Sequence, residues 1–149
     1  VGYNKPGSCE GYCSGSGMVR LAKIIGGKNK YKKSYEDYVK IIGGEENLSA
    51  KTLAEQARNG NDFSLAVYKK SGEMLGRTLS VLVDVLNPEK IIIGGVYMRS
   101  HDLLLPPCER VMKKECLSFS LNVVSVLPAG LGEKIGDFAA LSVAKGDFL

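Results

Sequence analysis

The stretch from Leu86 to Val96 reads LNPEKIIIGGV, and it decides the fold of this chain. A long segment with helical spacing of apolar residues leads into it, and Asn87-Pro88 ends that pattern. Lys90–Ile93 predicts a short strand, because three consecutive isoleucines suit a strand covered on both faces, as in a parallel sheet. Gly94-Gly95 then predicts either a tight turn or a close approach of backbone to a ligand. Helix, strand and glycine pair together indicate the core of an α/β nucleotide-binding half, with the ligand beyond the carboxyl end of the strand.

Helical patterns fill the chain before this stretch. Apolar residues from Phe63 to Leu86, Leu82 included, recur with helical spacing and predict a long core helix that begins at Asp62. Gly72 and Gly76 lie four residues apart on one face of it, so another backbone or a flat ligand can approach there. Shorter amphipathic helices are predicted at Cys9–Ile25, at Tyr35–Ile42 and, capped by Ser49, at Ala50–Arg58.

After the glycine pair, the pattern predicts a helix, a strand and a last helix. Ser100 is expected to cap a segment that Pro106-Pro107 kinks or restarts before Cys108–Glu115. Asn122–Leu127 predicts a second strand, and the segment 131–144 predicts the last helix. This order of elements favours a parallel α/β sheet over a helix bundle.

The composition indicates one soluble domain that covers residues 1–149. The hydrophobic share of 44% and the charged share of 24% are ordinary for a globular chain that can bury a core. No apolar run approaches the roughly 20 residues of a membrane helix. Val1–Pro6 is expected to be extended, and no secretory signal is expected because Val1–Gly7 is short, polar and glycine-bearing. Four cysteines in a chain of this size predict free thiols in a cytoplasmic protein. The sequence at Val1 already looks like the middle of a domain. We therefore expect this chain to be part of a longer protein.

Three further patterns carry little specific chemistry by themselves. Lys28–Lys33, KNKYKK, concentrates part of the net charge of +4 in one loop, which is either a solvated connection or a contact for an anion or phosphate. Gly15-Ser16-Gly17 does not complete a dinucleotide-binding motif, because Arg20 stands where its last glycine would lie. His101 has no Cys, Asp or Glu at metal-ligand spacing around it and is read as an ordinary polar residue.

Three pieces of the chain match one known family in order and spacing. They are GSCEGYCSG at Gly7–Gly15, LNPEKIIIGG at 86–95 followed by DLLLPP at Asp102–Pro107, and PAGLGEKIGDFAA at Pro128–Ala140. Together they resemble the C-terminal half of the ROK family, the bacterial sugar kinases and sugar-responsive repressors of the actin-like ATPase superfamily. The resemblance implies an α/β fold, the C-terminal half of an actin-like ATPase (ribonuclease H-like) fold, rich in helix with a small, mainly parallel sheet.

The resemblance also implies binding roles for particular residues. A glutamate of the family motif, which hydrogen-bonds sugar hydroxyls, falls on Glu10 here. Read without the resemblance, Glu10 is a charge at a helix N-terminus. The residues expected to border the adenine and ribose of ATP are Gly94, Gly95 and Val96, joined from the next strand end by Gly130 and Gly132.

The chain lacks the catalytic segments of that family. The phosphate-binding D-x-G-G-T segment, the Asp that acts as general base and the E-x-x-H sugar motif do not occur in it, so no catalytic residue is assigned. The chain alone is therefore expected to be inactive, and ATP with Mg²⁺ is expected in the full-length protein. No zinc is expected, because Ser8 replaces the last cysteine of the zinc knuckle of the family, and Cys9 and Cys13 lack a third ligand.

The resemblance leaves three functions open. The first is the C-terminal domain of an ATP-dependent sugar kinase for hexoses or N-acetylhexosamines, with the sugar, ATP, the N-terminal half and a second copy in a homodimer as partners. The second is the sugar-sensing domain of a transcriptional repressor, in which a separate helix-turn-helix binds DNA. The third is a non-catalytic dimerisation module, because apolar surface left by the missing half promotes association. No membrane partner is expected.

Overall fold

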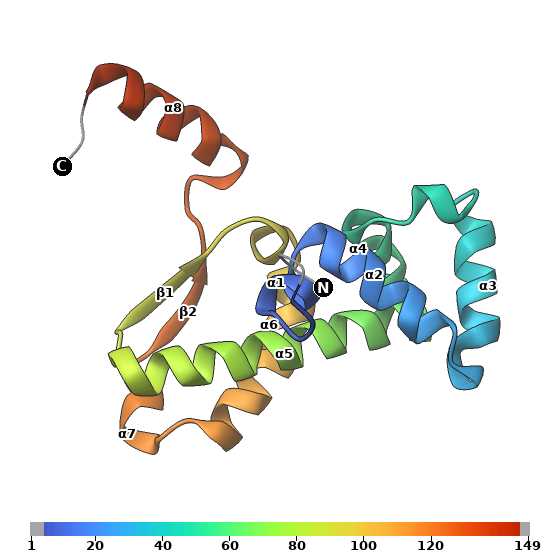
Figure 1. Ribbon diagram of the computed structural model, residues 1–149, viewed down its shortest axis with the longest axis horizontal. Coiled ribbons are helices and arrows are strands. Elements are labelled where there is room, and N and C mark those ends of the chain that lie inside the picture. Colours follow the sequence, from blue (N-terminus) through green and yellow to red (C-terminus); the bar gives the residue numbers. More distant parts are fainter. Residues whose placement is uncertain (1–4, 147–149) are drawn as a thin grey trace.

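The computed structural model describes residues 5–146, except for the side chains of Glu133 and Ile135. Most of the extended segment predicted at Val1–Pro6 lies outside this range. Helices dominate, and a small parallel sheet lies beside the end of the longest helix (Figure 1). The elements are α1 (Cys9–Cys13), α2 (Gly15–Gly26), η1 (Asn29–Tyr31), α3 (Lys32–Ile41), η2 (Glu45–Asn47), α4 (Ala50–Arg58), α5 (Asp62–Leu86), β1 (Lys90–Ile93), α6 (Val96–Glu115), α7 (Ser118–Leu121), β2 (Ser125–Pro128), η3 (Gly132–Lys134) and α8 (Ile135–Lys145).

The two longest helices, α5 and α6, lie with their backbones in close contact at the centre of the fold. A Cβ atom at Gly72 would meet Cγ of Pro107 at 2.5 Å, and one at Gly76 would meet the carbonyl oxygen of Cys108 at 2.5 Å. Glycine permits this approach because it has no side chain. The prediction that another backbone lies against these two glycines is therefore confirmed.

The apolar stripe of α5 forms much of the core, as its spacing predicts. Phe63, Val67 and Val83 are fully buried. Leu82 and Leu86 were predicted to share that face, but they remain 42% and 68% exposed, so this part of the prediction is wrong. Both lie on the last turns of α5, on a flank that the described elements leave open.

The sheet consists of β1 and β2 in the predicted parallel arrangement, with Ile93 opposite Pro128. β1 has the predicted bounds, whereas β2 begins later than predicted because α7 and its last turn occupy the preceding residues. Ile91 and Ile93 pack against the core, but Ile92 between them is 66% exposed. The prediction of a strand covered on both faces is therefore wrong for this chain, since one face of the sheet is open.

The helix predicted at Cys9–Ile25 is in fact two helices, α1 and α2. Ser14 is extended between them, and its hydroxyl accepts a hydrogen bond from the N–H of Gly17 at 3.0 Å. A serine in this role satisfies a free N–H group at the start of α2 and so favours a new helix over a continuous one. Gly17 also lets α2 pack tightly on α1, because a Cβ there would collide with the carbonyl oxygens of Glu10 and Gly11.

The basic segment Lys28–Lys33 is more helical than predicted. Its centre forms η1, and α3 begins at Lys32 rather than at Tyr35. α4, by contrast, has the predicted bounds. The hydroxyl of Ser49 accepts from the N–H of Thr52 at 3.1 Å, and the Thr52 hydroxyl accepts from the N–H of Ser49 at 3.1 Å, which completes a capping box.

α6 bends at Ser100 and not at its prolines. Ser100 has non-helical angles (φ −141°, ψ 31°), whereas Pro106 and Pro107 continue the helix, so the predicted kink at the proline pair is wrong. The φ angle that proline imposes is compatible with a helix, and Pro107 is buried against α5. The bend is fixed by Tyr68 of α5, whose hydroxyl hydrogen-bonds to Ser100 Oγ at 3.3 Å and donates to the carbonyl oxygen of Ala50 at 2.8 Å.

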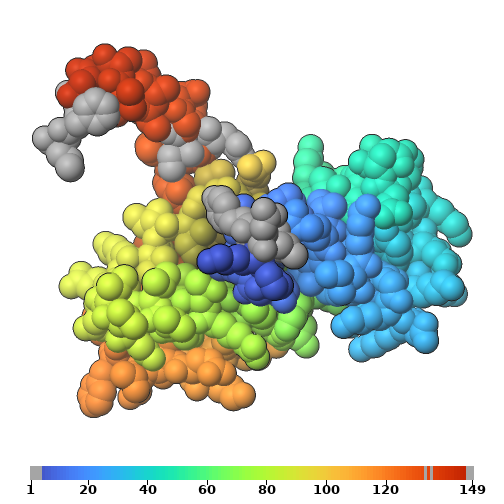
Figure 2. Space-filling view, viewed as in Figure 1, coloured from blue at the N-terminus to red at the C-terminus, as the bar shows by residue number. Residues whose placement is uncertain are grey.

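The last helix, α8, stands apart from the rest of the molecule (Figures 1 and 2). It begins slightly later than predicted, after η3, and all of its side chains that are described are exposed. Phe138 and Leu141 are among them, at 48% and 57%. Among the described residues, no helix has the length and apolar character needed to cross a bilayer.

Arg58 joins α4 to the first half of α6. Its Nε and Nη2 atoms donate to the two carboxylate oxygens of Asp102 at 2.9 and 2.8 Å, and Nη2 also donates to the carbonyl oxygen of Arg99 at 3.1 Å. These hydrogen bonds hold the pKa of Asp102 below its ordinary value and raise the pKa of Arg58. The arginine fork thereby fixes where α4 lies relative to the start of α6.

Replacing the carboxylate of this ion pair tests its contribution to stability. Asp102→Asn is expected to lower the free energy of unfolding by about 0.5–1 kcal/mol at neutral pH, because the pair is partly exposed. Since the folded-state pKa of Asp102 is lowered, its contribution is present above the unfolded-state pKa and is lost as the pH falls through the folded-state value. Urea unfolding at a series of pH values measures this. A difference between the two proteins that does not shrink in acid would contradict the assignment.

Adding a methyl group at the helix contact tests how closely α5 and α6 approach. Gly76→Ala is expected to lower the free energy of unfolding by about 1–3 kcal/mol, because the two helices must move apart. Gly15→Ala is the matched control, since its Cβ would meet only Cγ2 of Val96, at 3.9 Å, and urea unfolding should show no loss. Equal stability of Gly76→Ala and the parent chain would disprove the contact.

Candidate functional site

The carboxyl ends of β1 and β2 bring four of the predicted site residues to one edge of the sheet. The N–H of Ala129 donates to the carbonyl oxygen of Ile93 at 3.0 Å, so the two strands end side by side. Both strands then continue into glycine-bearing turns, and a Cβ at any of these glycines would meet no atom within 4 Å. The open glycines are Gly94, Gly95, Gly130 and Gly132, and this edge is where parallel α/β sheets bind ligands.

Gly95 has a further structural role, because it begins α6. Its φ of 62° lies in the left-handed region, which favours glycine, and Val96 opens the helix directly after it. The N–H groups in the first turn of a helix lack partners within that helix and attract anions. The turn therefore presents bare backbone and the start of a helix on the same side of the molecule.

A hollow of about 440 Å³ lies beside this turn, between α4 and the first residues of α6. Its volume lies in the range of small-molecule sites. Val96 lines it, as predicted, and Gly15 from the start of α2 closes one side. The remaining wall was not predicted. It comes from α4 and the α6 bend and consists of Ser49, Ala50, Lys51, Ala54, Glu55, Arg58, Arg99 and Ser100.

The α4 wall combines small side chains with charges. Ala50 and Ala54 lie one turn apart on α4 and leave room, and Lys51 and Glu55 lie one turn apart beside them and are exposed. Arg58 also lines the hollow, but Asp102 already neutralises it. The spacing of the two alanines is the one signal in the sequence that a small-residue surface exists here.

Glu10 lies in the first turn of α1, and its side chain is exposed. Within residues 5–146 its carboxylate forms no hydrogen bond or ion pair, so it is available to a ligand. α1 is held on α5 by Ser71, whose hydroxyl donates to the carbonyl oxygen of Tyr12 at 3.0 Å. The start of α2, which follows α1, lies near the glycine turn, since a Cβ placed on Gly15 would be 3.9 Å from Cγ2 of Val96.

Cys9 and Cys13 also lie on α1 and point toward α5. The Sγ atom of Cys13 hydrogen-bonds to the carbonyl oxygen of Ser71 at 3.6 Å. A hydrogen bond between the two thiols lowers the pKa of Cys9, and the same bond, with burial, raises the pKa of Cys13. In the part of the chain that the structure describes, no three His, Cys, Asp or Glu side chains gather closely enough to hold a metal ion. The hydrogen bond of Cys13 joins α1 to α5.

Comparison with known proteins agrees with this architecture. The model of the ROK family matches residues 4–147. The glucokinase of Thermotoga maritima is 29% identical over 77% of the chain, and the DNA-binding transcriptional dual regulator NagC of Escherichia coli is 26% identical over 78% of it. Among solved structures, a ROK family glucokinase from Streptomyces griseus, in complex with glucose and AMPPNP, superposes with a TM-score of 0.77 at 23% identity over 95% of the chain.

The chain spans less than half the length of each of these proteins: 37% of the Thermotoga glucokinase, 28% of NagC and 46% of the Streptomyces glucokinase. The predicted fold class is confirmed, with many helices and one small parallel sheet in the arrangement of the actin-like ATPase fold. The predicted family is confirmed as well, because the match covers nearly the whole chain. The chain belongs to the ROK family.

Proposed function

We propose that this chain is the C-terminal domain of an ATP-dependent sugar kinase, in which it supplies one wall of the nucleotide pocket and a carboxylate that contacts the sugar. The observation that carries the proposal is the open glycine turn between β1 and α6, beside a hollow large enough for a nucleoside. The similarity to a glucokinase that was solved with glucose and AMPPNP supports it. In this proposal the protein works in the cytoplasm as a homodimer.

The nucleotide would bind beside the glycine turns, where no side chain covers the backbone. Gly94 and Gly95 have no side chain to exclude a ribose or phosphate, and Gly130 and Gly132 leave the same space open from β2. Val96 and the alanines of α4 offer an apolar surface for a flat base. Lys51 and Glu55 are exposed and would lie at the rim. There the ammonium group of Lys51 can donate hydrogen bonds to the nucleotide, and the carboxylate of Glu55 can accept them.

The sugar would bind at Glu10. A carboxylate accepts hydrogen bonds from two neighbouring hydroxyls at once, and this one has no partner in the described chain. Hydrogen bonds to a charged acceptor are stronger than those between neutral groups. The close packing of Gly17 on the backbone of Glu10 and Gly11 fixes the backbone from which the carboxylate projects.

The chemical step would depend on residues outside this chain. Phosphoryl transfer needs a base for the attacking hydroxyl and positive groups around the transferred phosphate, and we assign neither to a residue here. Magnesium would accompany ATP, bound chiefly to its phosphates, as this ion usually is. This domain would bind and orient the two substrates, and a partner domain would supply the base.

A sugar-sensing domain of a repressor is the second candidate. The match to NagC covers as much of the chain as the match to the Thermotoga glucokinase, and it supports this alternative. Both candidates use Glu10 for the sugar. They differ at the glycine turn, because a nucleotide is required only for the kinase.

Closing the glycine turn tests the nucleotide wall. In the full-length protein, Gly95→Val is expected to weaken binding of a fluorescent ATP analogue about tenfold or more, because a branched side chain would enter the open space. Gly60→Val is the matched control, since Gly60 also has a positive φ, of 82°, with open space around it, but lies in the turn before α5. Equal affinity in both variants would contradict the nucleotide site and leave the repressor candidate standing.

Neutralising Glu10 tests the sugar site. Glu10→Gln in the full-length protein is expected to weaken sugar binding about ten- to a hundredfold, the loss typical of a hydrogen bond to a charged group. Isothermal titration with glucose and N-acetylglucosamine measures the change. Glu36→Gln, at an exposed position of α3, should leave the affinity unchanged. Unchanged sugar affinity in Glu10→Gln would refute the assignment without affecting the nucleotide site.

A further inference from the structure

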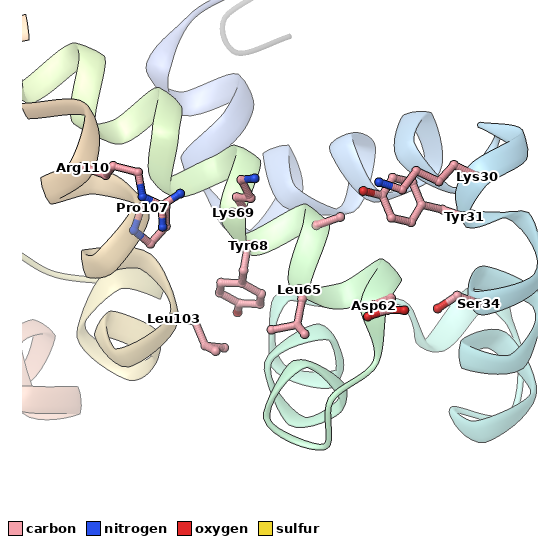
Figure 3. A pocket seen from close by; sticks show the side chains of 11 residues that line it. Lys30, Tyr31, Ser34, Asp62, Leu65, Tyr68, Lys69, Leu103, Pro107 and Arg110 are labelled. Atoms are coloured by element: carbon pink, nitrogen blue, oxygen red, sulfur yellow. The ribbon is translucent and has the colours of Figure 1, made fainter. Parts of the chain in front are cut away.

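A second hollow, of about 500 Å³, lies on α5 away from the glycine turn. It runs along α5 between the η1–α3 segment on one side and α6 on the other (Figure 3). Lys30 and Tyr31 stand at one end of it, Arg110 stands beside Pro107 at the other, and Lys69 lies between them (Figure 3). Because these groups are spread along the hollow, it suits an extended occupant better than one small ion.

The hollow has an excess of positive charge that the protein itself does not neutralise. Within the described part of the chain, Lys30, Lys69 and Arg110 form no ion pair with any carboxylate. One carboxylate, that of Asp62, lies at the end near Lys30. The three cations attract a ligand that carries several negative charges. The one carboxylate suits a hydrogen-bond donor or a cation at one end of that ligand.

The floor of the hollow is apolar. Leu65 and Leu103 point into it in Figure 3, and Leu65 is 39% exposed. Ala66 and Pro107 complete the same surface. An occupant that carries charge alone would leave this surface in water, whereas one with apolar groups between its charges would cover it.

A neighbouring hollow of about 360 Å³ extends the same pattern. It shares Tyr31, Ala66 and Lys69 with the first, so the two hollows adjoin each other. Its apolar lining includes Ile24 of α2, which is 66% exposed. Besides Lys69, its charged lining consists of the cations Lys28 and Lys70 and one carboxylate, that of Glu73. Lysines above exposed aliphatic side chains thus recur along one groove.

The aromatic residues of the groove are already engaged. The ammonium group of Lys30 lies 5.2 Å from the centre of the Tyr31 ring, and Tyr68 is buried with its hydroxyl bonded to Ala50 and Ser100. The buried ring of Tyr68 is therefore not free to stack on a base, which is the usual contact of single-stranded nucleic acid. The apolar floor also offers a phosphate backbone neither a positive charge nor a hydrogen-bond donor.

We propose that this groove binds an acidic, amphipathic peptide segment of a partner protein, with its carboxylates on Lys30, Lys69 and Arg110 and its apolar side chains on the floor around Leu65. The proposal does not depend on the sugar kinase function, because it uses none of the residues of that site. It assigns a role to the basic segment Lys28–Lys33, which the candidate site leaves unused.

The test uses a short fluorescein-labelled peptide in which Glu and Leu alternate, titrated with the full-length protein and followed by fluorescence anisotropy. Lys69→Glu and Arg110→Glu are each expected to weaken binding about tenfold, through loss of one attraction and gain of one repulsion. Lys114→Glu is the matched control, since Lys114 is exposed on the same helix as Arg110 but lies outside the groove. It should leave the affinity unchanged. All three positions are exposed, so the variants should fold normally.

Three further ligands separate the parts of the proposal. A peptide with Ser in place of Leu should bind more weakly, and one with Lys in place of Glu should not bind. Absence of binding by the Glu–Leu peptide would overturn the proposal, as would an equal loss in Lys114→Glu, which would indicate general charge attraction only. Tighter binding of a single-stranded oligonucleotide, lost in the same groove variants, would overturn it in favour of a nucleic-acid surface.

Discussion

The contact between α5 and α6 at Gly72 and Gly76 sets the position of every wall of the candidate site. Because the two backbones touch there, the ends of the helices have little freedom to move. α6 starts from the turn at Gly95, so its contact with α5 also fixes where β1 must end. α1 and α4 are then attached to this pair, α1 through Ser71 of α5 and α4 through the arginine fork to α6.

Two chemically different surfaces result from that arrangement. The glycine turns present bare backbone with no charged side chain of their own, which suits a ligand recognised by shape and by N–H groups. The groove on α5 presents unpaired cations over aliphatic side chains, which suits a ligand recognised by charge and apolar contact. We assign a general base to neither surface, because our proposal gives this domain the role of binding and orienting the substrates.

The elements that the sequence predicts correctly are those set by local chemistry. The capping residues around α4, the long stripe of α5 and the isoleucines of β1 each specify their own structure within a few residues. The helix through Pro106-Pro107 depends instead on tertiary packing, since Pro107 lies against Gly72 of α5.

The same distinction applies to the site. Gly94, Gly95 and Val96 follow a strand directly, and their place at its carboxyl end can be predicted from the order of residues alone. The α4 wall is about forty residues earlier in the chain and is held at the site by long-range contacts, which include the Arg58–Asp102 pair and the hydrogen bond from Tyr68 to Ala50. A pairing over that distance leaves no periodic pattern, so the wall could not be predicted. The exposed face of Ile92 is a related case, since three isoleucines indicate that a strand is apolar but not which elements cover it.

The side chain of Tyr68 contacts residues of both surfaces. Its ring lines the groove on α5, and its hydroxyl is bonded to Ala50 and Ser100, which both line the hollow beside the glycine turn. Burial raises the pKa of this phenol, so it stays protonated at physiological pH and keeps its donor. A ligand in the groove that shifted the ring would therefore act on α4 and on the bend of α6 together.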